Sequence, residues 1–251
     1  MRTFGQLLVR GLIVGLFAGL LAGTFAYVMG EPRVDAAIAI EEANAGAHTH
    51  DHGDEHAASS SEEEAPLVSR SGQKAGLFLA TGLSGVALGG IFAVGFTLLR
   101  RKLRTGNDAY AALGLAAAGF IGIVLVPFLK YPPNPPAVGD PETITRRTVT
   151  YLLTIVIGLL AVCAGVALSR WAARYGDVAR LAGGVVGLVV TVVAAYLILP
   201  RINEVPDTFP ATLLWQFRFA SLGTQATLWL LLGFGYAATV ARRPSEQKVN
   251  A

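Results

Sequence analysis

All four histidines of this 251-residue chain lie in one short tract, His48-Thr49-His50-Asp51-His52-Gly53-Asp54-Glu55-His56, where they alternate with carboxylates. Neutral imidazole together with carboxylate suits borderline divalent cations such as cobalt, nickel, zinc or copper. A flexible tract imposes no coordination geometry and loses entropy when a ligand orders it, so it is suited to loose capture of a metal. The alternative is a solvated low-complexity linker. The predicted metal-contacting residues are His48, His50, His52 and His56.

A second set of polar residues follows the apolar segments, at the expected water boundary. Carboxylate and amide oxygens can hold a divalent ion, together with carbonyls freed at proline-broken helix ends. For any single residue the alternative is a solvated loop side chain. We predict a metal site at the outer mouth formed by Glu31, Asp35, Asn203 and Glu204. We predict a substrate path lined by Tyr131, Asn134, Asp140, Glu142, Asp207, Arg218 and Gln225.

The sequence lacks the groups that intramembrane serine proteases and phosphate-loop enzymes need for catalysis. Gly82-Leu83-Ser84-Gly85 matches the Gly-x-Ser-Gly pattern of intramembrane serine proteases, but no apolar segment contains a histidine that could act as the base. No lysine follows a glycine, so there is no phosphate-binding Gly-Lys-Ser/Thr loop. The single cysteine, Cys163, cannot form an intramolecular disulfide and is interpreted as a packing residue. We therefore predict that the chain is not an enzyme and holds no tightly bound cofactor.

The composition indicates a membrane protein. Hydrophobic residues make up 53% of the chain and charged residues only 15%, unlike an average soluble domain. Six windows without charge are each long enough to cross about 30 Å of hydrocarbon as a helix. We predict an all-α polytopic protein with a single membrane domain over residues 1–251 and six transmembrane helices in three hairpins. The predicted spans are 8–30, 75–99, 109–129, 149–169, 180–200 and 219–241.

The distribution of charge predicts the orientation. With the N-terminus inside, the inner segments hold 12 of the 20 Lys and Arg residues, and the outer segments hold 14 of the 17 acids. The positive-inside bias therefore places both termini in the cytoplasm. Because the basic residues are scattered as helix-end anchors, the basic pI does not indicate nucleic-acid binding. The first apolar run exceeds the 7 to 15 residues of a signal-peptide core, so we expect the segment to be retained.

The first apolar segment carries a glycine at every fourth residue, which predicts a face for close helix packing. The packing glycines are Gly11, Gly15, Gly19 and Gly23. We predict that this helix ends at Gly30-Glu31-Pro32; if it resumes, Glu31 and Asp35 fall on one face. Residues 43–71 then form a flexible, His- and acid-rich extracytoplasmic loop.

Prolines dominate two further outer segments. The run from Pro127 to Pro136 predicts a stiff extended loop, and another outer loop begins at Pro200. Residues 211–219 are predicted to form an interfacial helix before the sixth span. The first, third and fifth spans each finish in a proline-containing loop with acids. This pattern fits a parallel repeat, or only the ordinary composition of loops.

Four long motifs stand in these predicted outer segments: Glu31-Pro32-x-Val34-Asp35, Tyr131-Pro132-x-Asn134-Pro135-Pro136, Pro200-x-x-Asn203-Glu204-Val205-Pro206 and Leu214-Trp215-x-Phe217-Arg218. Together they resemble the CbtA family of predicted bacterial cobalt transporter subunits. The likeness covers essentially the whole chain.

The resemblance implies that cobalt(II) is the substrate, taken up across the cytoplasmic (inner) membrane of a bacterium for cobalamin synthesis. It also implies a small one-span partner of the CbtB type. The lipid bilayer is then the other partner, and no nucleic acid is expected. Two alternatives remain open: a non-transporting, metal-binding membrane scaffold or partner subunit, and a transporter of another small solute.

Overall fold

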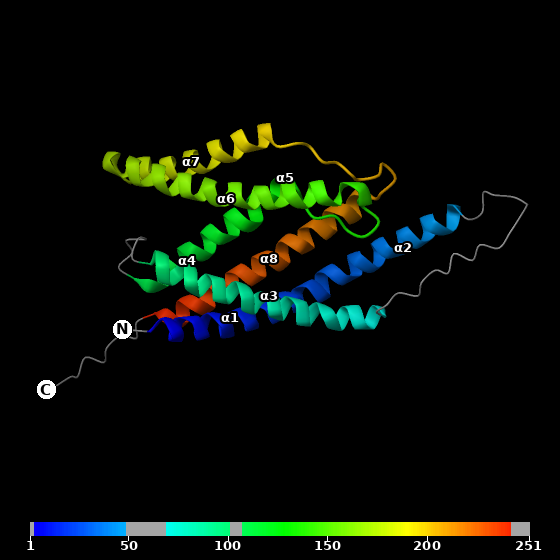
Figure 1. The fold of residues 1–251 in the computed structure, drawn as a ribbon, viewed down its shortest axis with the longest axis horizontal. Coiled ribbons are helices and arrows are strands. Elements are labelled where there is room, and N and C mark those ends of the chain that lie inside the picture. Colours follow the sequence, from blue (N-terminus) through cyan, green and yellow to red (C-terminus); the bar gives the residue numbers. More distant parts are fainter. Residues whose placement is uncertain (1–2, 49–68, 101–106, 242–251) are drawn as a thin grey trace, which may run out of the picture.

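The computed structural model describes residues 3–48, 69–100 and 107–241, and the regular structure of these ranges is entirely helical. The helices run along one common direction as an elongated bundle (Figure 1). In chain order the elements are α1 (Phe4–Phe25), η1 (Ala26–Gly30), α2 (Glu31–His48), α3 (Arg70–Leu99), α4 (Asp108–Gly119), η2 (Phe120–Leu125), α5 (Val126–Lys130), η3 (Pro141–Thr143), α6 (Ile144–Ala172), η4 (Ala173–Tyr175), α7 (Asp177–Ile198) and α8 (Ala211–Val240).

Five helical segments of the described chain are long and apolar enough to cross a membrane. They are Phe4–Asn44, Arg70–Leu99, Asp108–Lys130, Ile144–Tyr175 and Asp177–Ile198. The prediction of an all-helical, multi-span protein is confirmed at this level. The predicted sixth span lies in α8, which is 30 residues long but is not among the five. This helix carries several polar residues, including Ser221, Thr224 and Gln225, and these lower its hydropathy.

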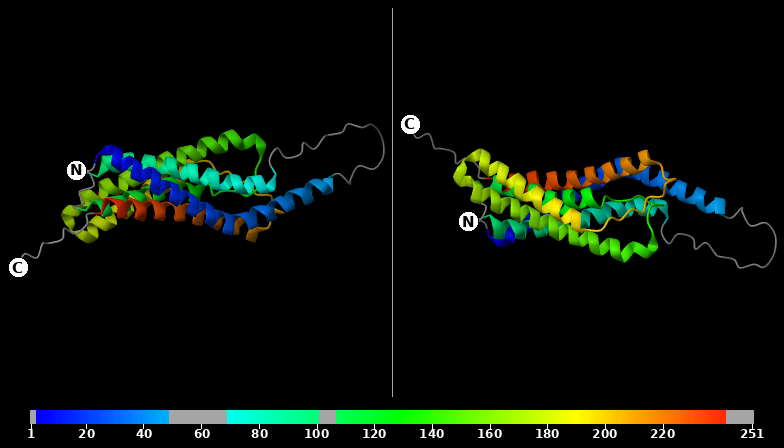
Figure 2. Two further views of the ribbon diagram at one scale, coloured as in Figure 1. Left: turned by 90° about the horizontal axis from the view of Figure 1, so that it is seen from below. Right: turned by 90° about the horizontal axis from the view of Figure 1, so that it is seen from above.

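The start of α1 and the end of α8 lie at the same end of the bundle, where Arg10 Nη1 donates to the Thr239 carbonyl at 2.6 Å. The Tyr236 hydroxyl donates to the Leu7 carbonyl there at 3.4 Å. The loops that follow α5 and α7 gather at the opposite end, on the side toward which α2 extends (Figures 1 and 2). We call this the loop end of the bundle.

The packing of the helices agrees only in part with the predicted arrangement of three successive hairpins. α1 packs along α3, as expected for a first hairpin, and η2 and α5 pack against α6. α7 packs along α6 and α8 packs against α1 and α4, so α7 and α8 are not a packed pair. Close glycine contacts favour the α6–α7 pair, because a Cβ on Gly187 would lie 2.8 Å from the Ala164 carbonyl oxygen. α8 thus packs one face against the bundle, with nine buried residues along its length.

The first helix does not end at Glu31-Pro32, so this prediction is wrong. A π-helical turn, η1, precedes Glu31, whose N–H bonds the carbonyl of Ala26 five residues back. The same arrangement recurs at η2, where the Val126 N–H bonds the Ile121 carbonyl just before Pro127. A proline lacks the N–H for the next helical bond and clashes with a regular preceding turn, and the wider π turn accommodates it. The helices therefore continue to His48 and to Lys130.

Three further boundaries differ from the sequence predictions. The predicted extended loop at 127–136 begins only at Tyr131, because residues 126–130 are helical. Residues 211–219 are the first turns of the continuous helix α8, and do not form a separate interfacial helix. The predicted loop 43–71 is helical at both edges, up to His48 and from Arg70, and residues 49–68 lie outside the described ranges.

Cys163, interpreted from the sequence as a packing residue, is exposed on the surface of α6.

Candidate functional site

A cavity of about 750 Å³ lies near the loop end, between α8, α6 and the η2–α5 segment. The loops after α5 and α7 also contribute to its wall. Six polar residues singled out in the sequence line it, together with Ser221: Tyr131, Asn134, Asn203, Glu204, Arg218 and Gln225. The structure thus brings together residues that lie up to 94 positions apart in the chain, from Tyr131 to Gln225. Convergent polar groups in a largely apolar wall are typical of a small-molecule or ion site.

The cavity follows α8 from Arg218 to Trp229, a rise of about 16 Å along the helix. Trp229 is 7% exposed and presses against α4, since a Cβ on Gly119 would lie 2.3 Å from its ring. Beyond Trp229 the bundle is filled by a tight aromatic cluster in which Phe92 and Phe96 both pack edge-on against Tyr236. The cavity is therefore closed toward the end of the bundle where α1 begins.

Lys130 and Tyr131 join the two proline-containing loops. Lys130 Nζ donates to the carbonyls of Tyr196 at 2.9 Å and Leu199 at 3.2 Å, so it caps the C-terminal end of α7. The Tyr131 hydroxyl donates to the Pro200 carbonyl at 2.7 Å. Burial raises the pKa of the Tyr131 phenol, which therefore remains a neutral donor.

Helix α2 covers the two loops from the other side. Ala37 of α2 is fully buried and packs in one cluster with Val138, Phe209 and Leu214. These residues come from the loop after α5, the loop after α7 and the first turn of α8. The three outer segments that follow the first, third and fifth predicted spans are therefore packed together at the loop end.

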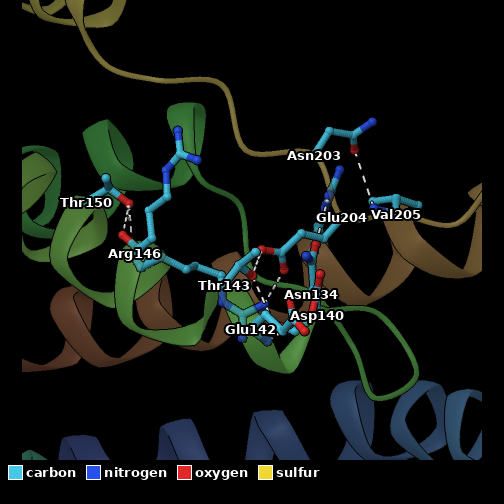
Figure 3. Close-up of polar contacts among 11 residues, drawn as sticks. Asn134, Asp140, Glu142, Thr143, Arg146, Thr150, Asn203, Glu204 and Val205 are labelled. Carbon is cyan, nitrogen blue, oxygen red and sulfur yellow. Dashed lines mark hydrogen bonds and ion pairs between the residues drawn. The ribbon is translucent and has the colours of Figure 1, made fainter.

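Glu204 is the carboxylate of the cavity, and its side chain is only 7% exposed. It accepts hydrogen bonds from the Thr143 hydroxyl and from Arg147 Nη1 (Figure 3). The Thr143 bond, assisted by the Arg147 charge, holds the pKa of Glu204 below its usual range, although burial opposes the shift. Glu204 is therefore ionised at neutral pH and already has a positive partner.

Glu31 and Asp35 belong to a different group. Arg70 Nη2 contacts Glu31 at 2.5 Å, and Asp35 pairs with Arg70 at 2.8 Å and with Lys74 Nζ at 2.9 Å. These ion pairs tie the start of α2 to the start of α3. Neither acid lines the cavity of Glu204. The structure therefore does not bring the four predicted outer ligands into one site.

Three residues of the predicted substrate path lie outside the cavity: Asp140, Glu142 and Asp207. Asp140 Oδ1 accepts the Glu142 N–H at 2.9 Å and so caps the turn that leads into α6, while Glu142 itself is exposed. Asp207 is exposed in the loop after α7. Asn203 lines the cavity wall, but its Oδ1 turns back toward the Val205 N–H at 3.5 Å (Figure 3).

The histidine tract lies almost wholly outside the described residues. His48 is the last residue of α2, whereas His50, His52 and His56 fall in the undescribed range 49–68. Among the side chains that the structure describes, no group of three or more His, Cys, Asp or Glu residues could hold a metal ion.

Sequence reasoning missed Arg147, which neutralises Glu204, and Thr143, which donates a hydrogen bond to it. It also missed Trp229, which closes the cavity. Arg147 lies at the start of a span, where basic residues are ordinary anchors, so its type and position gave no signal of this role. The pairing of Arg147 with Glu204 depends on how the loop after α7 packs against the first turn of α6.

Replacing Glu204 with Gln is expected to lower the stability of the bundle by about 1–3 kcal/mol at neutral pH, because Arg147 loses its buried counter-charge. A carboxylate with a lowered pKa stabilises the fold above its ordinary pKa of about 4.3, and this contribution is lost as the pH falls through the folded value. Thermal unfolding in detergent should thus show a smaller acid-induced loss in Glu204→Gln than in the wild type. The exposed Glu142→Gln serves as the control, and a pH profile parallel to that of the wild type in Glu204→Gln would contradict the pairing.

Comparison with known proteins identifies the family. Residues 4–241, nearly the whole chain, match the family described as "Probable cobalt transporter subunit (CbtA)". No curated protein and no solved structure matches the chain significantly. The chain therefore belongs to the CbtA family of probable cobalt transporter subunits.

Proposed function

We propose that the chain is the membrane subunit of a cobalt uptake transporter and that the cavity lined by Glu204 and Arg218 is the outer part of the solute path. The observation that supports this most strongly is the cavity itself. It is a largely apolar cavity beside α8 into which several polar groups converge; the two proline-containing loops form its wall at the loop end, and Trp229 closes it at the other end. A site reached from one side and sealed on the other is what alternating access requires.

We propose that α8 is a sixth span despite its polar residues. It packs against α1 and α4, and its Arg218, Ser221 and Gln225 line the cavity, where they need not meet lipid. With six crossings, both termini lie in the cytoplasm and the loop end faces outward, as the positive-inside rule predicts. Asp207→Cys in a Cys163→Ala background should then react with a membrane-impermeant maleimide added outside intact cells. Labelling only after lysis would contradict this orientation.

The metal is proposed to reach the cavity in steps. His48, His50, His52 and His56 raise the local cobalt concentration outside, and Glu31 and Asp35 mark the outer end of the α1–α3 pair. Asn203 and Glu204 are at the cavity, where Glu204 would need to exchange its Arg147 partner for the ion. We further propose an inner-membrane location in a bacterium, a small CbtB-like partner, a link to cobalamin synthesis and no enzymatic activity.

The second candidate function is a non-transporting, metal-binding scaffold. It is favoured by the absence of a multidentate metal site among the described residues, because a scaffold could bind metal only through the histidine tract. Cobalt-57 accumulation in vesicles distinguishes the two. The full chain reconstituted with its one-span partner is expected to accumulate the isotope, with nickel, zinc and copper as competitors that report selectivity. Vesicles containing both folded proteins that take up no more cobalt than empty vesicles would favour the scaffold.

A further inference from the structure

Arg218 has no carboxylate partner in the cavity. Its Nη2 donates to Asn134 Oδ1 at 3.0 Å and its Nε to the Pro133 carbonyl at 3.4 Å, both neutral acceptors. The guanidinium also lies 5.2 Å from the centre of the Trp215 ring. The ion pairs among the described residues involve Arg70, Lys74 and Arg147 and leave Arg218 out. A half-buried guanidinium with unused N–H donors attracts an anionic oxygen.

The rest of the wall complements this positive charge. Arg218, Ser221 and Gln225 are spaced by three and four residues, so they lie on one face of α8, and all three line the cavity. Asn134 adds a further amide beside Arg218. The only carboxylate in the lining, Glu204, is neutralised by Arg147. Among the described residues, the charged lining has two guanidinium groups and one carboxylate, a net charge of +1, which disfavours a bare divalent cation as long as Arg147 holds Glu204.

The size of the cavity also exceeds what an ion needs. Six waters around a metal ion occupy about 180 Å³ at their volume in the liquid, whereas the cavity measures about 750 Å³. That volume falls in the range of small-molecule sites. We propose that the cavity binds a small carboxylate-bearing anion, with one carboxylate on Arg218 and hydrogen bonds from Gln225 and Ser221. The carboxylate could arrive free, or as a chelate whose other oxygens hold the metal.

The test uses citrate, which is a carboxylate and also chelates cobalt(II). Purified full-length protein in detergent is titrated with citrate while tryptophan fluorescence is followed, because Trp215 contacts Arg218 and Trp229 lines the cavity. We expect saturable binding that weakens by about tenfold or more in Arg218→Gln, since a charged bidentate contact is lost. Arg218→Lys should bind with intermediate affinity because it keeps the charge but loses the planar fork.

Arg201→Gln is the matched control, because Arg201 is exposed in the loop after α7 and does not line the cavity. Its affinity for citrate should stay within about twofold of the wild type. Thermal unfolding checks that each variant is folded, and Arg218→Lys provides the comparison if Arg218→Gln is not. An absence of saturable citrate binding to the wild type, or equal affinity in the wild type and both folded Arg218 variants, would overturn the proposal.

A second titration with equimolar cobalt(II) distinguishes the two sources of carboxylate. Tighter binding with the metal assigns the site to a chelate. Weaker apparent binding assigns it to the free anion, because cobalt(II) withdraws free citrate from solution, and equal binding shows that the site accepts both forms. The inference concerns the same cavity as the proposed function but can fail separately. Cobalt uptake without citrate binding would overturn the anion site alone, and citrate binding without cobalt uptake would overturn only the transport of cobalt.

Discussion

Replacing Gln225 with Trp is expected to reduce cobalt-57 uptake by more than about tenfold, which corresponds to a barrier increase of at least about 1.4 kcal/mol. Gln225 lines the cavity between Arg218 and Trp229, and the chamber has room for an indole ring without displacement of a helix. The larger side chain would fill the route between the loop end and the floor formed by Trp229. Uptake is measured in cells that produce the chain and its partner at matched membrane levels.

Leu230→Trp is the matched control for this substitution. Leu230 lies on the same helix but points out of the bundle, with 57% of its surface exposed, so the added ring should meet lipid. Uptake close to that of the wild type is expected. If Gln225→Trp also transports normally at normal protein levels, the solute does not pass through this cavity and the proposed path is wrong.

Substituting Ala for Gly15 is expected to destabilise the bundle by up to about 3 kcal/mol, the upper part of the range for overpacked sites. A Cβ on Gly15 would lie 2.1 Å from the Gly85 carbonyl oxygen and 2.9 Å from the Gly89 Cα, both backbone atoms of α3. Neither can move without separating the two helices. For a chain of this size the unfolding midpoint should fall by roughly 6–12 °C.

Gly114→Ala makes the same chemical change in α4, where nothing lies within 4 Å of the new Cβ. It should leave the unfolding midpoint unchanged or raise it slightly, because alanine favours helix over glycine by about 1 kcal/mol. Comparison of the two variants in detergent separates the close contact from the helix-propensity effect. Equal midpoints would show that α1 and α3 do not meet through Gly15.

Several polar residues of the cavity could be named from the sequence because they stand in the long motifs that resemble the CbtA family. Tyr131, Asn134, Asn203, Glu204, Arg218 and Gln225 were all named from the sequence, and one cavity contains them. Their partners were not predictable. Glu204 was expected to be an ion ligand, but Arg147 and Thr143 already occupy its carboxylate oxygens. Glu31 and Asp35 were assigned to the same site, but Arg70 and Lys74 hold them elsewhere.

The predicted helix ends at the proline motifs were wrong, and the difference has a physical explanation. Local rules predict that Pro32 and Pro127 break a helix, because each lacks an N–H. In the bundle, the π turns η1 and η2 provide the extra residue that a proline needs, and the chain stays helical beyond each of them with a change of direction (Figure 1).

The sequence by itself determined that the chain is helical, that it crosses a membrane several times and that α1 has a glycine face. These properties depend on local composition and spacing, since hydrocarbon admits only backbones that satisfy their own hydrogen bonds. Tertiary structure alone decided that α7 lies on α6 and that α8 packs against α1 and α4. It also decided that Arg218, with no carboxylate partner among the described residues, lines a cavity whose carboxylate is neutralised. Those outcomes depend on contacts between residues tens of positions apart, which no local periodicity encodes.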